Sequence, residues 1–132
     1  MSASDSIGVF VVDDHLPFLA AAEAVVDATP GFDLVGTAAS AAEAMGRLDL
    51  DDGMIDLVLM DIDLGDGSGA DVSAVVTEQH PHPVVFLIST MDAADVGTLP
   101  QECGASAFIT KLELSPTELR RLWSKRHDGS NR

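Results

Sequence analysis

Residues 55–69 read IDLVLMDIDLGDGSG and carry the clearest strand signal of the chain. Their apolar run, Leu57 to Met60 with Ile55 before it, leads directly into Asp61. A continuous apolar run bounded by glycine and aspartate is typical of a strand buried on both faces of a parallel sheet. The carboxyl ends of such strands form the edge at which open parallel sheets bind ligands. Asp61 is therefore expected at that edge, either as a solvated strand terminator or as part of a site.

Further apolar runs predict four more strands, over residues 7–12, 32–38, 84–88 and 107–110. Segments with helical signals lie between them, so strands and helices alternate along the chain. This alternation predicts an α/β fold with a parallel sheet and helices on both faces. Of the two common doubly wound arrangements, we expect the flavodoxin-like one, with five strands in the order 2-1-3-4-5.

The helices are predicted from apolar spacing and capping residues. The first runs from Pro17 to Thr29, capping boxes open helices at Ser40 and Ser115, and Ser68 caps a helix that continues to Gln79. In the 68–79 helix the inward residues are expected to be Val72, Val75 and Val76. Residues 50–53 are predicted as a turn. Gly97 and Pro100 interrupt the segment 91–103, so its helix is expected to be short or broken.

Length and composition indicate one well-packed domain. The chain has 132 residues, 46% of them hydrophobic, and its mean hydropathy is +0.21. A domain of this size buries roughly 68% of its unfolded surface. No apolar stretch approaches the ~20 residues of a membrane helix, and the N-terminus MSASDSIG lacks a signal pattern. The single cysteine, Cys103, excludes an internal disulfide, and a cytoplasmic protein is expected.

The net charge of −15 is unevenly spread. Residues 1–119 contain 21 acidic and 2 basic side chains, whereas residues 120–132 contain 5 basic side chains and one acidic. The acidic body would repel phosphates, so direct binding of nucleic acid is not expected. The basic end is either a partner surface or the usual complement of a helix dipole.

Polar side chains follow four of the five predicted strands, and they are Asp13, Asp14, Asp61, Ser89, Thr90 and Lys111. The carboxyl ends of parallel strands meet at one edge, so these residues are expected to converge. Two like charges ~4 Å apart at an effective dielectric of ~20 repel by about 4 kcal/mol. Three carboxylates therefore need either a proton or a bound cation, and Mg²⁺ is the expected ion. One Mg²⁺ together with Lys111 would neutralise all three carboxylates.

This arrangement suits phosphoryl transfer to a carboxylate. An aspartate with a reference pKa near ~3.9 is ionised at neutral pH, so Asp61 is expected to act as a nucleophile without a base. The reaction then requires in-line positioning and neutralised phosphoryl oxygens. Mg²⁺, Lys111 and the Ser89 hydroxyl would each hold one oxygen, and a backbone N–H after Asp61 could add a further donor.

The motifs VVDDH at 11–15, LVLMDIDLGDGSG at 57–69, FLIST at 86–90 and CGASAFITK at 103–111 carry a family resemblance. They resemble the receiver domain of bacterial two-component response regulators, over residues 6–126, with flexible ends at 1–5 and 127–132. PGFDLVGTAASAAEA at 30–44 looks closest to receivers that often precede a helix-turn-helix output domain. No DNA-binding segment follows residue 127, so we expect output through a partner or through self-association.

The resemblance implies a role for each residue of the edge. Asp61 is the phosphoacceptor, and Mg²⁺ is held by Asp13, Asp14, the Asp61 side chain and the backbone carbonyl of Asp63. Ser89 and Lys111 bind the phosphoryl group. The switch residues are Ser89, Thr90 and Phe108.

The resemblance also implies partners. The phosphoryl donor would be a histidine kinase or a His-containing phosphotransfer protein, and output would use the face of helix 4, strand 5 and helix 5. Such a protein assists its own phosphorylation and dephosphorylation but turns over no separate substrate. Gly65 replaces a frequent proline and Phe108 replaces a common tyrosine. Thr90 replaces a frequent alanine, and we expect its bulk to slow loss of the phosphoryl group.

Two other functions and a second metal site are also compatible with the sequence. Asp61-Ile62-Asp63 also resembles the DxD motif of haloacid-dehalogenase-type phosphatases, but the acidic pair here precedes Asp61 instead of following the lysine. A pseudo-receiver that only binds partners is a further alternative, although every site residue is present. His80 and His82 are spaced like a metal pair but have no third ligand in the sequence.

Overall fold

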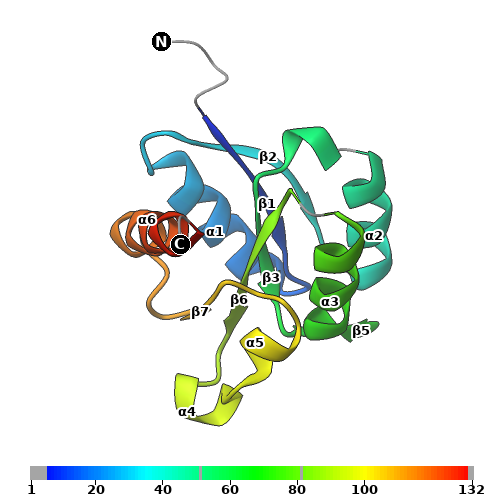
Figure 1. Ribbon diagram of the computed structural model, residues 1–132. Coiled ribbons are helices and arrows are strands. Elements are labelled where there is room, and N and C mark those ends of the chain that lie inside the picture. Colours follow the sequence, from blue (N-terminus) through cyan, green and yellow to red (C-terminus); the bar gives the residue numbers. More distant parts are fainter. Residues whose placement is uncertain (1–5, 51, 81, 131–132) are drawn as a thin grey trace.

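The computed structural model describes residues 6–50, 52–80 and 82–130. Its main sheet has the order β2-β1-β3-β6-β7, and every neighbouring pair is parallel. This confirms the predicted order 2-1-3-4-5 and the doubly wound fold (Figure 1). The main strands are β1 (Ile7–Val12), β2 (Phe32–Ala38), β3 (Leu57–Asp61), β6 (Val84–Ser89) and β7 (Ala107–Thr110).

The helices lie in two layers around this sheet, as Figure 1 shows. One apolar cluster joins the sheet to α1 (Leu16–Asp27) and α6 (Pro116–Ser130). A second cluster on the opposite face joins it to α2 (Ala41–Leu50), α3 (Gly69–Gln79) and the region of α4 (Ala93–Val96) and α5 (Leu99–Glu102). Because both faces are covered, β3 is buried along its whole length, as its apolar run predicts.

Local sequence signals explain where the helices begin. The Ser68 hydroxyl accepts the N–H of Ala70 at 3.1 Å, and the Ser115 hydroxyl accepts the N–H of Glu118 at 3.1 Å. The predicted break in 91–103 is confirmed, because α4 and α5 are separate one-turn helices and Gly97 between them has φ +61°.

Two details of the helices differ from the predictions. Residues 50–53 are not a simple turn, since α2 continues to Leu50 and a 3₁₀ turn spans Asp52–Met54. Val75 is 38% exposed, because the buried stripe of α3 runs through Val72, Ser73 and Val76. Ser73 belongs to this stripe through its hydroxyl, which donates to the Cys103 carbonyl at 3.0 Å.

The ends of the chain lie partly outside the described residues. Residues 1–5 and 131–132 are not described, and the backbone of α6 is described through Ser130. The flexibility predicted for 1–5 and 127–132 therefore stays a prediction. Within the described ranges, none of the helices has the length and apolar character that a membrane crossing requires.

Candidate functional site

The ends of β1, β3 and β7 bring three carboxylates and one ammonium together. Ligand oxygens of Asp13, Asp14 and Asp61 all lie within 4.8 Å of one another. Asp13 is fully buried and Asp61 is 4% exposed, whereas Asp14 faces solvent. The cluster, called the acidic pocket below, therefore has a buried side at Asp13 and Asp61 and an exposed side at Asp14.

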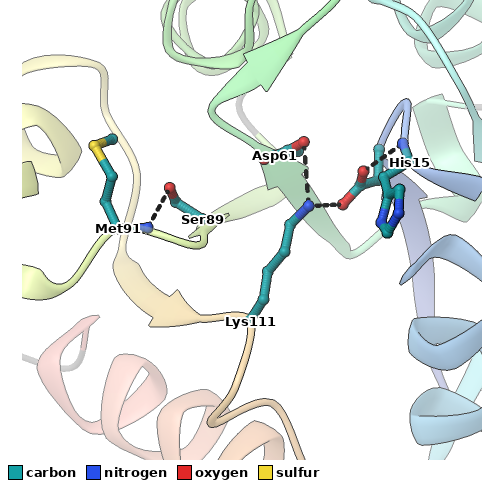
Figure 2. A network of polar contacts seen from close by, with 6 residues as sticks. His15, Asp61, Ser89, Met91 and Lys111 are labelled. Carbon is teal, nitrogen blue, oxygen red and sulfur yellow. Dashed lines mark hydrogen bonds and ion pairs between the residues drawn. The ribbon is translucent and has the colours of Figure 1, made fainter. Parts of the chain in front are cut away.

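Lys111 follows β7 and extends its side chain between the carboxylates (Figure 2). Its Nζ lies 2.7 Å from Asp13 Oδ2 and 3.5 Å from Asp61 Oδ2. The same Nζ lies 4.6 Å from the centroid of the Phe18 ring, within range of a cation–π contact. The Lys111 backbone N–H also donates to the Ser89 carbonyl at 2.8 Å. The ammonium is thus fixed from the sheet and from α1.

The environment of Asp61 changes its ionisation. Burial, followed by the nearby charge of Asp13, raises the pKa of Asp61 from 3.8 to about 7, against the lowering effect of Lys111 and of the Asp63 backbone N–H. The expectation that Asp61 is fully ionised at neutral pH is therefore wrong for the cation-free pocket. The reference pKa belongs to a solvated side chain, and this one is buried beside another carboxylate.

The donor set fits a hard divalent cation. Asp13 Oδ2 is buried, and its partner within the described part of the chain is the Lys111 ammonium at 2.7 Å. When all three carboxylates are ionised, the single ammonium leaves two negative charges uncompensated. Oxygen ligands and a net negative pocket are what Mg²⁺ prefers. A cation held by Asp13, Asp14 and Asp61 would relieve the repulsion that raises the pKa of Asp61.

Ser89 ends β6 beside this pocket, and its side chain is directed elsewhere. It is 2% exposed, and its hydroxyl accepts the N–H of Met91 at 3.0 Å (Figure 2). Thr90, next along the chain, is exposed. Phe108 on β7 is half-buried and packs against the cluster under α2 and α3. The structure therefore brings the side chains of Asp13, Asp14, Asp61 and Lys111 together, whereas within the described residues the side chains of the three predicted switch residues make no polar contact with them.

The loop after Asp61 packs closely around the acceptor. β4 (Asp63–Leu64) and β5 (Gly67–Ser68) form a small antiparallel ladder there. The side chain of Asp63 is exposed, and its backbone N–H hydrogen-bonds to Asp61. A Cβ on Gly65 would lie 3.2 Å from Asp14 Oδ2, and a Cβ on Gly69 would collide with the Asp61 carbonyl oxygen. The glycines of this loop allow the backbone to approach the acidic residues.

Sequence reasoning missed two residues connected to this site. Phe18 lies on α1, and only the structure shows the Lys111 ammonium above its ring. Asp66 lies in the loop between β4 and β5, and its carboxylate accepts two backbone N–H groups of α2. Neither contact leaves a signal in the sequence, because each joins segments far apart along the chain.

The two loop histidines have other partners. His80 Nε2 lies 3.0 Å from Asp49 Oδ1, and His82 Nε2 lies 2.6 Å from Asp56 Oδ1. Within residues 6–50, 52–80 and 82–130, the one group of three metal-ligating side chains is the cluster Asp13, Asp14 and Asp61. The histidine pair is therefore explained by contacts with acidic neighbours.

Comparison with known proteins gives curated relatives and solved structures. A protein-glutamate methylesterase/protein-glutamine glutaminase 4 of Geobacter metallireducens is 32% identical over 95 residues, which are 70% of this chain and 26% of the relative. The DNA-binding transcriptional activator DevR/DosR of Mycobacterium tuberculosis is 28% identical over 105 residues, which are 80% of this chain and 48% of the relative. The chain thus spans about a quarter and about half of the lengths of these two relatives.

Among solved structures, the CheX-CheY-BeF3-Mg+2 complex from Borrelia burgdorferi contains a similar chain, with a TM-score of 0.80 and 20% identity. The match covers 95% of this chain and 97% of that one, and it supports the fold. Residues 9–123 match the family of response regulator receiver domains. The chain therefore belongs to the response regulator receiver domain family of two-component systems.

Proposed function

We propose that this receiver accepts a phosphoryl group on the Asp61 carboxylate in the presence of Mg²⁺. The observation that carries the proposal is the cluster of Asp13, Asp14 and Asp61 oxygens within 4.8 Å, with the Lys111 ammonium 3.5 Å from Asp61 Oδ2. In this proposal Asp61 is the nucleophile, the three carboxylates are the oxygen ligands, and Lys111 is a fixed cation beside them. Phosphoryl transfer needs little beyond such positioning and charge neutralisation.

Each residue has a role in this proposal. Asp13, Asp14, the Asp61 side chain and the Asp63 backbone carbonyl would hold Mg²⁺. When bound, this ion supplies charge neutralisation for the phosphoryl oxygens. Lys111 would hold a second phosphoryl oxygen through its Nζ, and the backbone N–H of Asp63 would remain a donor beside the acceptor.

The chemical step is a displacement at phosphorus. An Asp61 carboxylate oxygen forms a bond to phosphorus, and the bond between phosphorus and the donor's leaving atom breaks. With a phosphohistidine donor, the leaving imidazole nitrogen takes the electron pair and a proton from solvent. The product is an aspartyl phosphate, and the donor is a histidine kinase or a His-containing phosphotransfer protein.

Readout of the phosphoryl group would involve Ser89 and Phe108. The Ser89 hydroxyl now accepts from Met91, so it would have to turn toward the phosphoryl oxygen. Phe108 would move toward the space that this turn leaves. The affected surface consists of the broken fourth helix (α4 and α5), β7 and α6, and an output partner or a second copy of the chain would bind there.

The proposal also covers the cellular setting of the chain. Membership of the receiver family supports a cytoplasmic signalling role without turnover of a separate substrate. The similar Borrelia burgdorferi CheY forms a complex with CheX, BeF3 and Mg²⁺, which supports an acceptor site that uses a metal. The phosphatase and pseudo-receiver alternatives receive no support from these comparisons.

Intact mass spectrometry tests the proposal. The purified protein is incubated with a small phosphodonor such as acetyl phosphate, with Mg²⁺ or with EDTA. We expect a gain of one phosphoryl group that requires both Mg²⁺ and Asp61. The matched variant Asp61→Asn keeps the shape of the side chain and removes the nucleophile. The absence of any gain in the native protein would instead favour the pseudo-receiver.

A further inference from the structure

The loop between Asp61 and α3 is fastened to α2 through Asp66. The two oxygens of its carboxylate accept the N–H groups of Ala41 at 2.8 Å and Ala42 at 3.1 Å, across 25 and 24 residues of sequence. Ala41 is the first residue of α2. The N–H groups in the first turn of a helix have no acceptor within the helix. Asp66 therefore supplies acceptors that the helix itself lacks.

Ser40 caps the same helix and leaves these two groups to Asp66. Its hydroxyl accepts the N–H of Glu43 at 3.0 Å, and its carbonyl accepts the N–H of Ala44 at 3.0 Å. The first four N–H groups of α2 are thus shared between Ser40 and Asp66. The N–H of Ala41, followed by that of Ala42, lowers the pKa of Asp66, so the exposed carboxylate is a charged acceptor at the positive end of the helix dipole.

The other side of this loop faces the acidic pocket. The backbone N–H of Asp63 hydrogen-bonds to Asp61, and Gly65 lies beside Asp14, with only 3.2 Å from its Cβ position to the Asp14 carboxylate. Gly65 and Gly67 flank Asp66 and give the backbone much conformational freedom. The ladder between β4 and β5 has only two residues on each side. Contacts from outside the loop are therefore needed to fix its position.

We propose that Asp66 is a positioning residue, which holds the acceptor loop against α2 so that Asp63 and Asp14 keep the geometry that binds the cation. This inference rests on the proposed function of the acidic pocket. Asp66 is not one of the cation ligands, so it acts on them through the loop backbone on either side of Asp66. Loss of residues that orient metal ligands typically costs about 10–100-fold in metal affinity.

Mg²⁺ affinity of the unphosphorylated protein tests this role, measured by isothermal titration calorimetry. We expect Asp66→Ala to weaken Mg²⁺ binding by about tenfold, at the low end of that range, because Asp66 contacts none of the ligand atoms directly and acts through the loop backbone. Asp66→Asn removes the same charge and retains one of the two oxygens that accept the N–H groups of Ala41 and Ala42, so it should restore part of the affinity. Asp27→Ala, at the far end of α1, is the matched control for loss of one exposed negative charge.

Hydrogen exchange of the backbone amides gives a second readout that involves no metal. Asp66→Ala should speed exchange at Ala41, Ala42 and the acceptor loop, and Asp66→Asn, which keeps one acceptor oxygen, should do so less. Native Mg²⁺ affinity in Asp66→Ala would overturn the proposal. Equal losses in the alanine and asparagine variants would also overturn it, because they would assign the effect to charge alone. A failure of Asp61 phosphorylation in the native protein would overturn the proposed function and leave these two measurements interpretable.

Discussion

Replacing Asp61 by asparagine should stabilise the cation-free protein at neutral and alkaline pH. In the unfolded chain Asp61 ionises near pH 3.8, whereas in the folded chain its pKa is about 7. Between these values the unfolded chain has released a proton that the folded chain still holds. Stability therefore falls as the pH rises through this window, and the loss is complete just above pH 7. Asparagine is neutral throughout and avoids the loss.

The magnitude follows from the displaced pKa. A rise from 3.8 to about 7 corresponds to about 4 kcal/mol at 1.36 kcal/mol for each tenfold step. Salt, and movement on the exposed side of the pocket, weaken the repulsion between the carboxylates. We therefore expect Asp61→Asn to raise the free energy of unfolding by about 1–3 kcal/mol at pH 8. At pH 5 the gain should be smaller, since most folded molecules then carry a protonated Asp61.

Urea unfolding in EDTA, followed by circular dichroism at pH 5 and pH 8, measures this difference. Asp27→Asn is the control, because it removes one exposed negative charge from a chain of net charge −15 without touching the pocket. A gain in Asp61→Asn that is the same at both pH values would refute the reasoning. A gain of equal size in Asp27→Asn would refute it as well, because the effect would then belong to net charge.

Three further substitutions test individual contacts. Lys111→Met should lower the free energy of unfolding of the cation-free protein by about 3 kcal/mol, measured in urea. The reason is that it leaves the buried Asp13 and Asp61 carboxylates without their charge partner. Unchanged stability would contradict the ion pairs. Thr90→Ala should shorten the lifetime of the phosphorylated protein, measured by loss of the added mass, because it opens the approach of water; an unchanged lifetime would contradict this role. Gly69→Ala should lower the melting temperature, since its Cβ collides with the Asp61 carbonyl oxygen; native stability would show that the loop can move aside.

The strands were predictable from sequence because each is a short segment rich in apolar residues, and four of the five end at a polar residue or directly before one. Ile7–Val12, Phe32–Ala38 and Ala107–Thr110 have the predicted bounds, and the topology follows from the alternation of strands with helices. The convergence of Asp13, Asp61 and Lys111 follows from the same rule. Parallel strands place their carboxyl ends at one edge, whatever their separation in sequence.

Other features depend on packing that the sequence does not state. The prediction that Val75 faces inward on α3 is wrong. Ser73 is buried there instead, because its hydroxyl donates a hydrogen bond to the Cys103 carbonyl. The pKa of Asp61 depends on how deeply the surrounding residues of the fold bury its carboxylate. The contact of Asp66 with α2 depends on the conformation of the loop. Gly65 and Gly67 allow this conformation, but they allow many others as well. Each of these features joins segments that local patterns treat separately.

The most direct test of the account is the mass of the protein after exposure to acetyl phosphate. We predict a gain of one phosphoryl group in the native protein with Mg²⁺, and none with EDTA or in Asp61→Asn. A gain that persists in Asp61→Asn, or one that needs no divalent cation, would contradict the assignment of Asp61 as the acceptor in a metal-assisted pocket.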